Sequence, residues 1–127
     1  MFITVRSRKP MGMVRQRFEE AAADRKFGVL GIHNVKATLN SRGLPFDRRI
    51  YVYEVCNPGA AKKVLDTNVK ISTALPCRVS IYEEGSGIVL ETLRPTLLIK
   101  MFQEPTLEGI AKEIETVIGE ILNEAAG

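Results

Sequence analysis

The sequence has little of the chemistry by which most enzymes can be recognised. Its 127 residues include no tryptophan, one histidine and two cysteines. It contains no Walker phosphate loop, no dinucleotide-binding glycine motif and no serine-nucleophile elbow. The two cysteines are 77 − 56 = 21 positions apart, which is neither a zinc-finger nor a thioredoxin spacing. The sequence therefore does not indicate a particular reaction.

Long apolar segments are also missing. No run of about eighteen apolar residues occurs, so we expect no membrane-spanning helix. Residues 1–6 lack an apolar stretch followed by a small-residue cleavage site, and so do not resemble a secretory signal. These features predict a cytoplasmic protein whose cysteines are reduced rather than joined in a disulfide.

The composition predicts a single globular domain over residues 1–127. A chain of this length buries roughly two-thirds of its unfolded surface on folding. Lys and Arg exceed Asp and Glu by 18 − 15 = 3, an excess too small to indicate nucleic-acid binding by itself. An alternative is a sheet face on which tyrosines stack with the bases of single-stranded nucleic acid and arginines bind its phosphates. No RNP-like motif accompanies these residues, so nucleic acid is not an expected partner. The members of this face would be Tyr51, Tyr53, Tyr82, Arg48, Arg49 and Arg78.

The strongest local signal lies around Cys56. β-Branched and aromatic residues over 49–55 predict a strand. Asn57 fits an N-cap, because its side-chain oxygen can accept an orphan amide hydrogen bond, and Pro58 fits the first helical position. A short helix is expected over residues 59–66. Cys56 thus lies between a strand end and a helix start, where unpaired amides and the helix dipole favour a thiolate.

Cys77 opens the next predicted strand, residues 77–82, in which apolar and polar side chains alternate. If the two strands are antiparallel neighbours in one sheet, Cys56 and Cys77 lie at the same rim. If they are parallel, the cysteines lie at opposite rims and cannot share a site.

Hydrophobic periodicity predicts the remaining elements. Further strands are expected at 2–5, 27–33 and 88–93, with a hairpin turn at 83–87, and helices at 10–26, at 35–42 and from 105 onward. Residues 67–74 read as an irregular connection, and 96–102 as a helical turn. In the strand at 27–33, alternation places Val29, Gly31 and His33 on one face and Leu30 and Ile32 on the other. This order of elements predicts an α+β two-layer sandwich.

Two motifs carry a resemblance to a known family. Cys-Asn-Pro followed by a helical Ala-Ala at 56–61, and Leu-Pro-Cys-Arg-Val at 75–79, resemble the bacterial and archaeal family called domain of unknown function three hundred and two. Residues 27–30, residues 35–39 and the closing amphipathic helix are also similar to it. The resemblance implies a curved, mainly antiparallel sheet of about five strands covered by helices and grouped with TATA-binding-protein-like folds. It implies no activity.

The candidate site combines both motifs, namely Cys56, Asn57, Pro58, Pro76 and Cys77. Free amides behind Pro58 would hold the carboxylate or phosphate of a small ligand. The two thiols would accept a thiol-reactive ligand or a metal ion. In the simpler interpretation both cysteines are small buried hydrophobes, and Asn57 and Pro58 only cap the helix.

His33 is the candidate third metal ligand beside Cys56 and Cys77, which would leave one coordination position open. It is also the candidate base for a Cys56 nucleophile, although a lone histidine near a strand end is more often simply hydrogen-bonded. We therefore expect a small cytoplasmic domain that binds an anionic or thiol-reactive ligand, or a metal ion. The alternatives are a homodimeric interaction protein that uses a sheet face or its last helix, and, below these, a cysteine-dependent enzyme.

Overall fold

Five strands and five α-helices make up the fold. The structure is a computed structural model that describes all residues from Met1 to Gly127. The strands are β1 (Phe2–Ser7), β2 (Gly28–Asn34), β3 (Ile50–Cys56), β4 (Cys77–Glu84) and β5 (Gly87–Leu93). The helices are α1 (Met11–Asp24), α2 (Val35–Ser41), α3 (Pro58–Thr67), α4 (Pro95–Met101) and α5 (Glu108–Ala126), with short 3-10 helices η1 (Val69–Ala74) and η2 (Pro105–Leu107).

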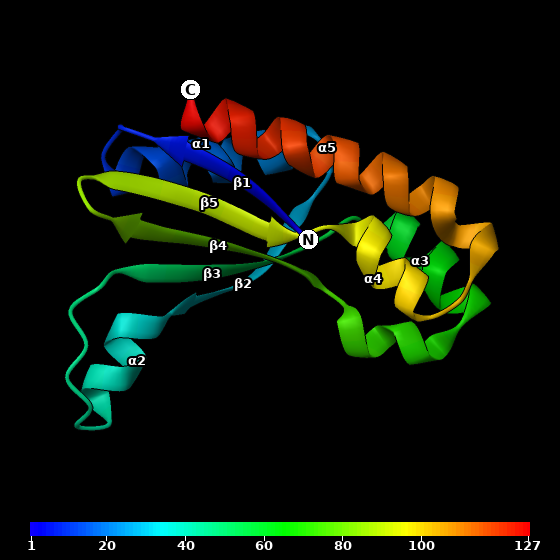
Figure 1. Ribbon diagram of the computed structural model, residues 1–127, viewed down its shortest axis with the longest axis horizontal. Helices are drawn as coiled ribbons and strands as arrows, with labels where there is room; N and C mark the ends of the chain where they lie inside the picture. The colour runs from blue at the N-terminus through cyan, green and yellow to red at the C-terminus, as the bar shows by residue number, and fades with distance from the viewer.

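The strands form one sheet in the order β1-β5-β4-β3-β2, and every neighbouring pair is antiparallel. Helices α1 and α5 pack against each other on one face of this sheet, and no helix crosses the opposite face, called here the open face (Figure 1). The predicted α+β class and the five-stranded antiparallel sheet are confirmed. The irregular connection predicted at 67–74 is instead mostly the 3-10 helix η1, whose start is capped by the Asn68 side chain.

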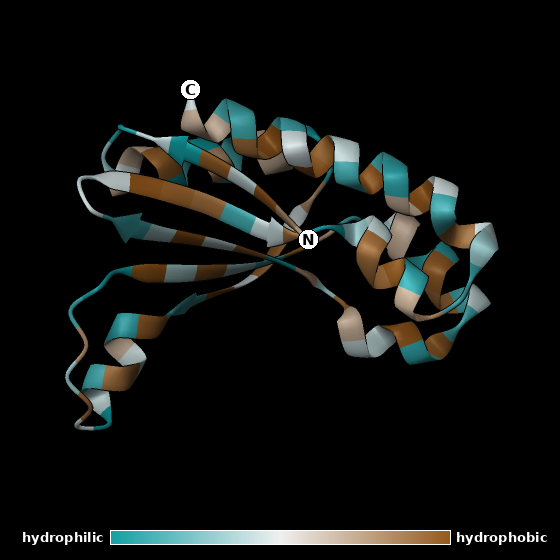
Figure 2. Ribbon diagram, in the orientation of Figure 1, coloured by the Kyte–Doolittle hydropathy of each residue, from teal (hydrophilic) through white to brown (hydrophobic).

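The main core lies between the sheet and the helices α1 and α5. Alternate strand residues such as Tyr53 and Ile81 point into it and meet Phe18 of α1, whose ring centroid is 4.9 Å from that of Tyr53. Each such side chain contributes about 1.5–3 kcal/mol through burial. Ile118, Ile121 and Leu122 of the apolar stripe of α5 are buried here too, and Figure 2 shows apolar residues recurring along this helix. None of the helices has the length and apolar character needed to cross a membrane.

A smaller cluster lies at one end of the sheet, where α3, η1 and α4 form what we call the end lobe (Figure 1). The first half of α5 extends over this lobe and closes its core. Its buried members are Val64, Ile71, Ile99, Leu107 and Ala111.

The alternation predicted for β2 is wrong because the strand contains a β-bulge. Val29 pairs with Val55, but the next pair is Gly31 with Glu54, so Leu30 is an extra residue on the β2 side. The bulge places Val29 and Ile32 on the same face and leaves the Leu30 side chain 65% exposed. A period of two cannot continue through such an insertion.

The segment between β2 and β3, residues 35–49, projects from the sheet and is called here the arm (Figure 1). Helix α2 opens the arm, and the Asn34 side chain caps it by accepting a hydrogen bond from Ala37 N at 3.0 Å. Gly43 follows at φ +76°, the left-handed conformation predicted for the helix end. No residue of α2 is buried.

Candidate functional site

The two cysteines lie at the same rim of the sheet, because β3 and β4 are antiparallel and Val55 pairs with Cys77. Both thiols are unpaired and half-buried, and both line a cavity of about 30 Å³, called here the thiol cavity. This volume is about one water molecule's share of the liquid. The thiol cavity is therefore a packing space between the sheet and α3 and is too small for an organic ligand.

Cys77 does not have the electrostatics of an activated thiol. Burial, and secondarily the nearby Cys56, raise the pKa of the Cys77 thiol to about 11. Cys77 is consequently a neutral thiol at pH 7, since a buried group without a cationic partner resists ionisation. This rim does not hold a pair of thiolates.

Asn57 and Pro58 cap α3 as predicted. The Asn57 Oδ1 accepts a hydrogen bond from Ala60 N at 3.1 Å, and Pro58 is an exposed residue in the first helical turn. A hollow of about 300 Å³, called here the Lys63 hollow, lies beside this helix start. Its charged residues include Glu113 as well as Lys63 and Arg25. The Arg25 guanidinium is 2.7 Å from the Glu124 carboxylate and 3.6 Å from that of Glu120, so Lys63 is the cation that remains for a ligand.

His33 does not join the cysteines. It lies on the open face, where its Nε2 is 3.2 Å from Glu54 Oε1. His33 pairs with Val52, four positions before Cys56 on β3, which corresponds to about 13 Å along the strand. The structure therefore does not assemble Cys56, Cys77 and His33 as ligands or as a nucleophile and base. No group of three His, Cys, Asp or Glu side chains has a geometry suited to a metal ion.

A third hollow, of about 280 Å³, opens where β4 and β5 meet the end lobe and is called here the Arg78 hollow. Arg78 is the one charged residue in its wall, and its Nη2 lies 3.4 Å from Glu54 Oε2. A guanidinium has five N–H donors, so most of them stay free for another acceptor. The other lining residues are Thr73, Ala74, Pro76, Cys77, Thr92, Leu93, Pro95 and Leu98.

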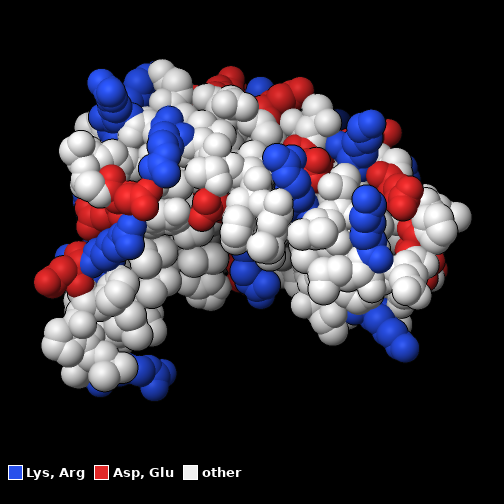
Figure 3. Space-filling model, viewed as in Figure 1, with Lys and Arg blue, Asp and Glu red and all other residues white.

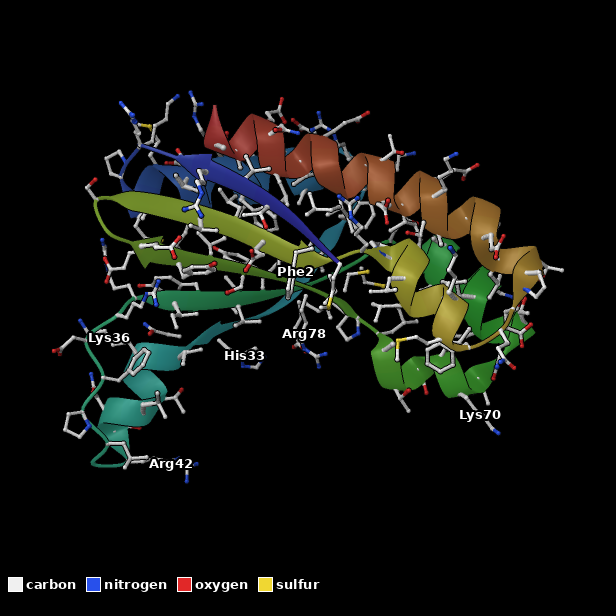
Figure 4. The ribbon with its side chains drawn as sticks, viewed as in Figure 1. Phe2, His33, Lys36, Arg42, Lys70 and Arg78 are labelled. Atoms are coloured by element: carbon white, nitrogen blue, oxygen red, sulfur yellow. The ribbon has the colours of Figure 1, made fainter.

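The surroundings of Arg78 are mainly uncharged. The molecule is indented between the arm and the end lobe, and uncharged surface predominates there (Figure 3). Arg78 and His33 point into this indentation from the open face of the sheet (Figure 4). Of the predicted site residues, Pro76 and Cys77 belong to the Arg78 hollow, whereas Asn57 belongs to the Lys63 hollow.

Sequence reasoning missed Glu54 and Gly31. The Glu54 carboxylate lies between His33 and Arg78, and a Cβ at Gly31 would come within 3.1 Å of Glu54 Oε1. Glycine at 31 thus gives the carboxylate room to lie over β2. The sequence did contain a signal for Glu54, since it is the one carboxylate in the otherwise apolar strand β3, where an ionised group needs partners.

The stacking face that the sequence offered as an alternative is not formed. Tyr53 is completely buried on the side covered by helices, where its hydroxyl bonds Glu19 and Arg15. Tyr82 lies on the opposite face, because its partner Val89 is one position from the core residue Ile88. The tyrosines therefore do not share one surface on which bases would stack.

Comparison with known proteins gives one clear result. A family model described as a domain of unknown function, DUF302, matches residues 3–125. The chain belongs to the DUF302 family. A crystal structure of an uncharacterized conserved DUF302 protein from Bacillus stearothermophilus is similar, with 32% sequence identity and a TM-score of 0.93. The match covers 98% of this chain and 97% of that one.

No curated protein matches the chain. The match to the DUF302 family model confirms the resemblance carried by the two cysteine motifs, and the crystal structure of the Bacillus stearothermophilus protein supports the fold. Neither names a ligand, metal or reaction, so the function has to be argued from the geometry of the site.

Proposed function

We propose that this DUF302 domain binds a small molecule with an apolar body and one anionic group, a carboxylate or a phosphate, in the Arg78 hollow. The observation that carries the proposal is the make-up of the wall, where Arg78 is the one ionic residue among nine. A single cation in a mostly apolar recess suits a ligand with one negative charge.

Size and chemistry support this assignment. The volume of about 280 Å³ is near the lower end of the range for small-molecule sites, which begins at about 300 Å³. The planar guanidinium of Arg78 can donate two parallel hydrogen bonds to a carboxylate or phosphate. Cys77 contributes a neutral thiol, which behaves as a small apolar group and does not repel an anion.

The Lys63 hollow is the weaker candidate for the same ligand. The amides at the start of α3 and the Lys63 ammonium favour an anion there. However, Glu113 in the same wall repels a negative charge, and Arg25 is occupied by Glu124. The wall of the Arg78 hollow contains no carboxylate, and Arg78 is paired less closely, at 3.4 Å from Glu54, than Arg25 is with Glu124 at 2.7 Å.

The two free thiols support a proposal about the compartment. Two unpaired cysteines at one rim are typical of a reducing environment, and we place the domain in the cytoplasm. Fractionation of the source cells with an antibody against the protein tests this placement. Recovery in a secreted or periplasmic fraction would contradict it.

Calorimetric titration with octanoate and with its uncharged analogue octanol tests the ligand proposal. Octanoate is expected to bind more tightly, and Arg78→Gln should abolish that preference, because hydrogen bonds to a charged group contribute about 1.5–3 kcal/mol. The matched control is Lys63→Gln, which removes a cation from the other hollow and should leave binding unchanged. If Lys63→Gln weakens binding and Arg78→Gln does not, the ligand site is the Lys63 hollow. If neither compound binds at millimolar concentration, octyl phosphate is tested next, and its failure would reject the proposal.

A further inference from the structure

The edge strand β2 and the arm form a surface that presents apolar side chains and is not covered by the rest of the chain. Val29, Leu30, Ile32 and Leu44 lie here and are between 37% and 65% exposed. Helix α2, only seven residues long, has no buried residue, and a helix of this length is unstable in isolation. Such a combination is characteristic of an interface.

The backbone of β2 is also free on its outer side. β2 is the last strand of the sheet, so its outward N–H and C=O groups have no neighbouring strand. Edge strands are usually protected by charged residues, proline or a bulge, and β2 has only the bulge at Leu30. After the bulge, Gly31–Asn34 pair regularly with β3. The opposite edge differs, because Arg6 on β1 is bonded to Glu84 at 2.7 Å.

We propose that a second copy of this chain covers this surface by antiparallel pairing of β2 with β2, about a two-fold axis that passes between Ile32 and Ile32 of the second copy. A two-fold axis brings each side chain close to its own equivalent, so an ionised group near the axis would be repelled by its copy. β2 contains no Lys, Arg, Asp or Glu. Self-pairing therefore has no like-charge cost, whereas an oppositely charged partner would find no complement on this strand.

The register of this pairing gives the arm a partner. With Ile32 opposite Ile32 of the second copy, Asn34 of that copy lies level with Leu30, and its helix α2 begins level with Val29. The two exposed side chains beside the bulge then meet the start of a helix that has no fully buried residue. A stable interface buries about 800 Å² on each partner. The few strand residues that pair beyond the bulge cover less than that area, so the arm has to supply the rest.

Analytical ultracentrifugation of the whole protein between about 1 and 100 µM tests the proposal, a range that brackets micromolar dimers. We expect a dimer, and Ile32→Lys should raise its Kd at least about tenfold, because juxtaposed like charges cost several kcal/mol. Met101→Lys is the matched control. Met101 is 73% exposed on α4, away from β2, so this variant should leave the Kd unchanged.

A second variant and a second measurement protect the test from misfolding. Leu30→Lys changes the bulge residue, which has no pairing partner on β3, and should weaken the dimer while circular dichroism stays native. Amide exchange over Gly31–Asn34 should slow as the protein concentration rises. A monomer throughout the range, or a dimer that withstands both lysine variants, overturns the proposal.

Discussion

Cys77 contributes to the walls of three spaces, namely the thiol cavity, the Arg78 hollow and an apolar cavity under α4. In each of them it presents a neutral sulfur, because burial raises the pKa of its thiol from 9.0 to about 11. Cys77 therefore affects the shape of the Arg78 hollow and adds no charge to it. The chemical reactivity of Cys77 is the direct measure of this environment.

Alkylation of Cys77 in the Cys56→Ala variant should be slow in the folded protein. At pH 8 the iodoacetamide rate is expected to be about 100-fold lower than in urea, because two pKa units reduce the thiolate population by that factor. The rate should rise about tenfold per pH unit until pH approaches 11. The Cys77→Ala variant, which retains Cys56, provides the comparison. A folded-state rate that levels off near pH 9 would show that Cys77 is not desolvated.

Helices α2 and α3 begin with the same asparagine cap but differ in what they bury. Asn34 Oδ1 accepts from Ala37 N at 3.0 Å, and Asn57 Oδ1 accepts from Ala60 N at 3.1 Å. Helix α3 buries Val64 in the end lobe, whereas α2 buries nothing. Losing a cap should therefore affect the whole protein in one case and a local segment in the other.

Alanine substitution of the two caps tests this difference. Asn57→Ala should lower the free energy of unfolding by about 1 kcal/mol, the usual cost of a lost N-cap. Asn34→Ala should leave the urea midpoint of the monomer unchanged and accelerate amide exchange within residues 35–41. The two variants serve as controls for each other, since each removes the same side-chain atoms. Equal losses of global stability would mean that α2 is an integral part of the cooperative fold.

The fold was accessible from the sequence because its signals are local. Strand alternation, the Asn-Pro helix start and the glycine at the end of α2 each depend on neighbouring residues alone. The β2 bulge was not accessible, because nothing in residues 28–34 reports that Leu30 lacks a partner on β3. The same holds for the Arg78 hollow, whose wall combines residues 73–78 with residues 92–98. The sequence predicted that Cys56 and Cys77 share a rim if β3 and β4 are antiparallel, and the two strands are antiparallel. Strand pairing alone does not show on which side of that rim a hollow lies.

The response of the whole molecule to alkali depends on a tyrosine in the middle of the core. The Tyr53 ring is completely buried, and its hydroxyl donates to Glu19 Oε2 at 2.8 Å and accepts from Arg15 Nε at 3.0 Å. Burial, followed by the bond to Glu19, raises the pKa of Tyr53 from 10.0 to about 12. Between these values the unfolded chain releases a proton that the folded protein retains, so stability falls as pH rises. The contribution is complete below pH 10 and is lost as pH passes through about 12.

Urea unfolding at intervals from pH 8 to pH 12 should therefore show a steep loss of stability in the wild type and a shallower one in Tyr53→Phe. At pH 8 the variant should be about 1 kcal/mol less stable, because it lacks the hydroxyl that bonds Glu19 and Arg15. The raised pKa of Cys77 acts with the same sign from pH 9 to about 11 in both proteins, so it cancels from the comparison. Tyr51→Phe removes a phenol from the same strand whose hydroxyl bonds neither Glu19 nor Arg15, and it is the control for the loss of stability at pH 8. Parallel curves for the wild type and Tyr53→Phe would mean that alkaline unfolding is driven by other groups, since ionisation of Tyr53 is the one step that this substitution removes.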